Sequence, residues 1–127
     1  MKFELNEDAV LRLNGAAMVT LGASVVACPR AHADQAFTLS AGYSEPMLRN
    51  FGAAVGWLGA EQLVLSARNH SQAAKKDLLK VAGFGWLAAS AASLSNLKNN
   101  YQPREVVYTS IAAQAVLAGL SLWKGFE

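Results

Sequence analysis

Charged side chains are scarce in this chain: Asp, Glu, Lys and Arg make up 16% of its 127 residues, against about a quarter in soluble domains. The few charges gather in short blocks and leave long uncharged stretches between them, while 53% of the residues are apolar. This composition favours a membrane protein over a solvated domain. The net charge of +2 is too small and dispersed for a nucleic-acid surface, so we expect no nucleic-acid partner.

Residues that carry chemistry are also few. The single cysteine, Cys28, excludes a disulfide within the chain. The two histidines, His32 and His70, fall in connections that we place on opposite membrane sides, so no metal site is expected. No nucleophile motif, phosphate loop or pair of carboxylates is visible, so we expect no catalytic residues and no enzyme activity.

The first residues, MKFELNEDA, are acidic where a secretory signal is basic and where transit peptides avoid acids. We therefore expect no cleavable targeting signal in the sequence as it stands. Either the chain inserts through its own helices, or a presequence has been removed.

Long apolar stretches are what the chain has in abundance. We predict one domain with helices over about residues 9–28, 47–67, 77–97 and 106–123. Each is close to the roughly 20 residues that cross a bilayer, and the prolines lie at or outside their edges. Short connections make neighbouring helices antiparallel, and the longest connection, residues 29–46, is expected to be irregular. The sequence therefore predicts an all-α integral membrane protein, a four-helix antiparallel bundle.

A soluble, alanine-rich four-helix bundle is the competing interpretation. It would need polar faces at helical spacing, yet no charge occurs from Gly15 to Cys28. Lysines and arginines are more numerous on the side that holds both termini and residues 69–76 than on the other. By this bias we expect both termini on the cytosolic, stromal or matrix side.

Small residues recur every fourth position on three of the predicted helices. These ridges let another helix approach closely, within the chain or from outside it. We expect helix-packing positions at Gly52, Gly56 and Ala60, at Gly85, Ala89 and Ser93, and at Ala16, Thr20 and Ser24.

Glu61 lies just past the middle of the second stretch, residues 49–68, where a charge inside a membrane needs a partner or a function. At about 100° per residue it lies about 140° from Gly56, so this helix has two sides that avoid lipid. Arg12 and Asn14 fall within about 6 Å of Glu61 in depth. We expect Glu61 to pair with one of them or with a neighbouring subunit, or to stay neutral. Proton transfer or ligation of a pigment metal is the alternative.

The stretch RNFGAAVGWLGAEQLVLSA and the basic turn after it resemble two groups of small tetraspan proteins. These are the DoxX-like group and the tetraspan scaffold of ergosterol biosynthesis, whose second helix carries an Arg-x-Phe-Gly pattern similar to Arg49, Phe51 and Gly52 here. Residues 14–18, NGAAM, resemble the Asn-Gly-Arg-x-Ala-Met stretch of chlorophyll-binding antenna helices, although the arginine is missing.

Together these features predict a non-catalytic accessory or structural subunit of a larger membrane complex, photosynthetic (a photosystem) or respiratory. Its partners would be other membrane subunits and the lipid bilayer, in a thylakoid or inner mitochondrial membrane. No cofactor is required by any motif, and lipid, chlorophyll or carotenoid at helix interfaces are the candidates. The alternatives are a free-standing DoxX-like tetraspan transporter or membrane enzyme partner that uses Glu61, and a pigment-binding antenna-type subunit.

Overall fold

The computed structural model describes residues 5–38 and 42–127, and every regular element in these ranges is an α-helix. The helices are α1 Glu7–Ala27, α2 Pro29–Ala36, α3 Glu45–Ala67, α4 Gln72–Lys98 and α5 Arg104–Phe126. The four long helices overlap the four predicted stretches, with ends that differ from the predicted ones by at most five residues, at the start of α4. The predicted all-α class is confirmed.

Capping residues explain where the long helices begin. The side chains of Asn6, Ser44 and Ser71 each accept a hydrogen bond from the backbone N–H three residues further on, at the starts of α1, α3 and α4. These bonds satisfy donors that the first helical turn leaves unpaired. Pro29 and Pro46 occupy first-turn positions, where a missing N–H costs nothing.

The connection between α1 and α3 was expected to be irregular, but it contains the helix α2. This helix buries Ala33, and its end is tied to the connection between α4 and α5. There the amide of Gln102 donates to the carbonyl oxygen of Ala36 at 3.2 Å, and the backbone N–H of Thr38 donates to the carbonyl oxygen of Tyr101 at 2.8 Å. With eight residues, whose non-polar members are alanine and proline alone, α2 offers no apolar periodicity from which a helix could be predicted.

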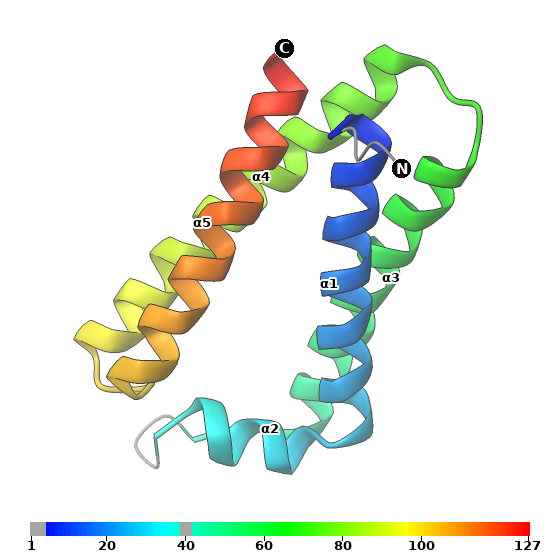
Figure 1. Cartoon of the computed structure of the whole chain (residues 1–127). Helices are drawn as coiled ribbons and strands as arrows, with labels where there is room; N and C mark the ends of the chain where they lie inside the picture. The colour runs from blue at the N-terminus through cyan, green and yellow to red at the C-terminus, as the bar shows by residue number, and fades with distance from the viewer. Residues whose placement is uncertain (1–4, 39–41) are drawn as a thin grey trace.

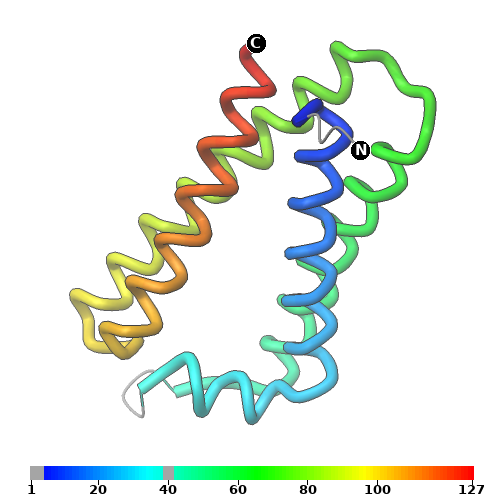
Figure 2. The backbone as a smooth tube through the Cα atoms, in the orientation of Figure 1, coloured from blue at the N-terminus to red at the C-terminus, as the bar shows by residue number. Residues whose placement is uncertain are grey.

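The long helices form two antiparallel hairpins, α1 with α3 and α4 with α5 (Figure 1). The hairpins meet at the end of the molecule that holds the start of α1, the end of α5 and the α3–α4 connection. They diverge toward α2, as the backbone trace also shows (Figure 2). The four long helices are therefore compatible with the predicted antiparallel bundle, in which the two hairpins splay apart as a V.

The hydrophobic core lies where the hairpins meet. Val10 and Leu11 of α1 and Leu79 of α4 are fully buried against one another. Leu5, Leu78 and Leu120 pack around them. Because this core is small, the rest of each hairpin depends on its own internal packing and on its surroundings.

Three helices, α1, α4 and α5, are long and apolar enough to cross a membrane. The helix α3 does not qualify, since Glu61, Gln62 and several glycines lower its hydropathy. Large apolar side chains are exposed on all four long helices, among them Trp57 at 69% and Val81 at 68%. An outer surface of this kind is compatible with an integral membrane protein, whose helices satisfy their own backbone groups in lipid.

Candidate functional site

Glycines bring α1 and α3 into backbone contact. A Cβ added to Gly15 would lie 2.7 Å from the carbonyl oxygen of Gly59, and one added to Gly22 would lie 2.5 Å from that of Gly52. The contact repeats every seven residues on both helices and not every four as expected. Gly52 lies within it, and Gly56 lies at its edge, with its N 2.5 Å from the Cβ added to Gly22.

The remaining predicted packing positions differ in their burial. Ala60 is only half-buried, and Ser93 is buried while Ala89 is half-buried. Gly85 faces open space: a Cβ added there meets nothing within 4 Å. The close contact of α4 with α5 lies at Gly83, two residues earlier, where an added Cβ would come within 2.5 Å of Leu122.

The expected positions on α1 also lie mostly outside its contact with α3. Ala16, Thr20 and Ser24 are exposed in the structure. The helix α1 therefore turns its glycines, and not this ridge, toward α3.

Three helices share hydrogen bonds through Asn14, whose side chain is fully buried. Its amide nitrogen donates to the hydroxyl of Ser121 on α5 at 2.7 Å, and its amide oxygen accepts from the indole N–H of Trp86 on α4 at 2.9 Å. We call Asn14, Trp86 and Ser121 the polar clasp. It joins the two hairpins near the core, and a hydrogen bond surrounded by apolar side chains is costly to leave unmade.

An ion pair reinforces this junction. Lys75 of α4 donates to the carboxylate of Asp8 on α1 at 2.6 Å, and the Lys75 side chain is only 8% exposed. Further along the α4–α5 hairpin, Ser90 donates to the side-chain oxygen of Gln114 at 3.0 Å. Polar contacts between helices thus follow α4 and α5 from the junction toward the open end of the V.

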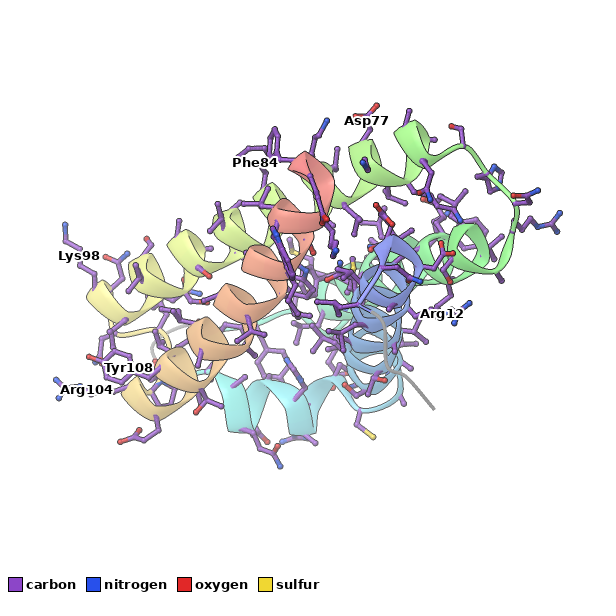
Figure 3. All side chains as sticks on the ribbon, turned by 45° about the horizontal axis from the view of Figure 1, so that its top comes forward. Arg12, Asp77, Phe84, Lys98, Arg104 and Tyr108 are labelled. Carbon is purple, nitrogen blue, oxygen red and sulfur yellow. The ribbon has the colours of Figure 1, made fainter. Side chains whose placement is uncertain are left out.

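The expected pairing of Glu61 with Arg12 or Asn14 is absent. Asn14 is engaged in the polar clasp, and both Glu61 and Arg12 are exposed, with neither in an ion pair among the residues that the structure describes. Figure 3 shows Arg12 extending outward from α1, on the side away from α4 and α5. Glu61 lies about 200° around α3 from Gly59, which touches α1, so it points away from α1 altogether.

Gln62, which follows Glu61 in the sequence, points toward α1. Gln62 is 4% exposed, and its amide nitrogen lies 3.1 Å from the sulfur of Met18 on α1. Its side-chain oxygen is buried without a hydrogen-bond partner within the described ranges. Spacing alone does not say which face of a helix meets which neighbour, so the sequence did not point to the contacts of Gln62, Trp86 and Ser121.

Two open hollows lie beside the α2–α3 connection, with volumes of about 650 and 370 Å³. They share Phe37, Gly42 and Tyr43.

Among residues 5–38 and 42–127, no group of three or more His, Cys, Asp or Glu side chains is placed to hold a metal. His32 lies in α2 and His70 in the α3–α4 connection, at opposite ends of the molecule (Figure 1). No protein-family model, curated protein or solved structure matches the chain, so the resemblances described above stay predictions.

Proposed function

We propose that the chain is a non-catalytic accessory subunit of a larger, multi-subunit membrane assembly, and that all four long helices cross the membrane. The single observation that carries the proposal is Glu61, which is exposed on the outer side of α3 and has no partner in the described part of the chain. A carboxyl group that faces lipid in the middle of a helix is costly, so such residues normally face other protein.

The contact of α3 with α1 supports the fourth crossing. The two helices are antiparallel and meet at the Gly15–Gly59 and Gly22–Gly52 contacts along most of their length. If α1 crosses the membrane, α3 therefore lies at the same depth. The low hydropathy of α3 then follows from its surroundings, because α1 covers its glycine face and a partner would cover Glu61.

Within this proposal the parent assembly is a photosynthetic or respiratory one, in a thylakoid or inner mitochondrial membrane. Co-migration with a photosystem or with a respiratory complex on sucrose gradients would distinguish the two. Pigment or lipid held by the assembly would be detected in the same fractions by absorbance and by lipid analysis.

The competing function is a free-standing transporter or membrane enzyme partner that uses Glu61. Such a role needs Glu61 beside an internal pathway, whereas the side chain lies on the outer face, on the far side of α3 from the polar clasp. The geometry therefore favours the subunit over the transporter.

The test is the mass of the full-length, tagged chain extracted from its native membrane in a mild detergent. We expect a large assembly that holds the chain in fixed stoichiometry with other membrane subunits. Recovery as a monomer or a homodimer would contradict the subunit role and favour the transporter.

A further inference from the structure

One face of α3 points away from α1, and its use as a docking surface rests on the function proposed above. Ala54, Trp57, Glu61, Val64 and Arg68 follow one another at alternating steps of three and four residues, and all five are exposed. We call this row the α3 seam. Its two large apolar members are strongly exposed, Trp57 at 69% and Val64 at 52%.

We infer that the α3 seam binds one transmembrane helix of a different subunit, which presents a basic side chain to Glu61 and small residues to Trp57. Rows at alternating steps of three and four residues are typical of helices that pack at a shallow, left-handed angle. A single polar residue within such a row fixes the register of the partner. A small residue opposite the indole would let the two backbones approach.

The depth and direction of Glu61 indicate that its carboxylate binds a protein donor and does not reach the water at the membrane surface. The nearer end of the helix, at Ala67, is six residues away, about 9 Å along the axis. Helical side chains leave the backbone toward the N-terminal end of their helix, which for Glu61 is away from Ala67. The carboxylate therefore cannot easily reach the nearer surface, and a donor must come to it.

The negative charge of Glu61 determines which kind of helix can bind the α3 seam. Arg12 extends outward from another helix (Figure 3), so it does not supply the donor within the same chain. A second copy of the chain that packed through the same face would set Glu61 against Glu61, and two like charges at that depth repel each other. A different chain with Lys, Arg or His at the level of Glu61 provides both the donor and the opposite charge.

Site-specific photo-cross-linking in the native membrane tests the inference on the full-length chain. A photoreactive amino acid replaces Val64, and the control carries it at Val81 of α4, which is more exposed than Val64 and lies outside the α3 seam. We expect Val64 to cross-link to one polypeptide, through an apolar segment that contains Lys, Arg or His. A cross-link to a second copy, to a segment without a basic residue, or to lipid alone would overturn the inference.

Variants then test the roles of individual seam residues. Glu61→Leu should lower the yield of the Val64 cross-link about tenfold, and Trp57→Ala should lower it as well. Leu58→Ala, a neighbouring exposed position outside the α3 seam, should leave the yield unchanged. Glu61→Lys combined with an acidic residue in place of the partner's basic one should restore the cross-link. Failure of this exchange, together with a normal yield for Glu61→Leu, would overturn the charge pairing.

The cross-linking results distinguish a failure of the α3 seam from a failure of the proposed subunit role. A large assembly in which Val64 cross-links only to lipid overturns the α3 seam and leaves the subunit role intact. A chain recovered as a monomer overturns the subunit role and removes the basis for the α3 seam.

Discussion

At the scale of single residues, the side chain of Asn14 joins α1 to both α4 and α5. It donates to Ser121 and accepts from Trp86 while fully buried. Asn14→Leu keeps a similar volume but leaves an indole N–H and a hydroxyl without partners, so we expect a loss of about 1–2 kcal/mol of stability. Denaturation in mixed micelles measures the change.

The matched control for Asn14→Leu is Ser90→Ala, which removes a hydrogen bond within one hairpin only. Distances between spin labels on α1 and α5 should broaden for Asn14→Leu and stay sharp for Ser90→Ala. Equal distance distributions in both variants would show that the polar clasp does not hold the hairpins together.

The Lys75–Asp8 pair supports a second prediction at this scale. Asp8→Asn leaves the Lys75 ammonium, whose side chain is 8% exposed, without its counter-charge. We expect a loss of about 1–3 kcal/mol, measured by thermal unfolding in detergent. Asp77→Asn is the control, because its partner Lys80 is 34% exposed and Asp77 itself 74%, and it should change stability by less than about 0.5 kcal/mol. Equal effects of the two substitutions would contradict the structural role given to Lys75.

At the scale of elements, the contact between α1 and α3 depends on its glycines. A Cβ at Gly22 would lie 2.5 Å from backbone atoms of Gly52 and Gly56, which cannot move without separating the helices. Gly22→Ala should therefore cost about 1–3 kcal/mol of stability in a detergent melt. Gly85→Ala adds the same methyl group where nothing lies within 4 Å, so it should be neutral or slightly stabilising. A melting temperature that falls equally in both variants would contradict the packing described here.

The positions of the long helices could be predicted from the sequence, but the side of each helix that meets its neighbour could not. The long helices follow from uncharged stretches with capping residues and prolines at their edges, and those features are local. The helices α4 and α5 touch at Gly83 and not at Gly85, which depends on how α4 is rotated against α5. Alanine, glycine and serine fill so many positions of α4 that its sequence does not distinguish one face from another. Glu61 was singled out because it lies within an apolar stretch, but its direction depends on which side of α3 meets α1.

At the scale of the whole molecule, the V shape follows from where the contacts between hairpins lie. The core of Val10, Leu11 and Leu79, the polar clasp and the Lys75–Asp8 pair all lie toward one end. At the other end, α2 and the backbone of Thr38 reach the α4–α5 connection. A sequence pattern that gives antiparallel order does not give the angle between two hairpins, because that angle depends on which few side chains meet.

Four membrane crossings would place the end of α1 and the end of α3 on opposite sides of the membrane. Cys28 is the only cysteine and is exposed at the end of α1, whereas His70 is exposed in the α3–α4 connection at the opposite end (Figure 1). If α1 and α3 both cross the bilayer, a membrane-impermeant thiol reagent should modify native Cys28 from one side of sealed vesicles. It should modify the Cys28→Ser/His70→Cys variant from the other side.

Carbonate extraction is the necessary control for this labelling, and the chain should stay with the membrane at high pH because its exposed side chains include Trp57, Val81 and Val116. Modification of both positions from the same side would be incompatible with four crossings. If α3 does not cross the membrane, Glu61 does not lie inside it and needs no protein partner there.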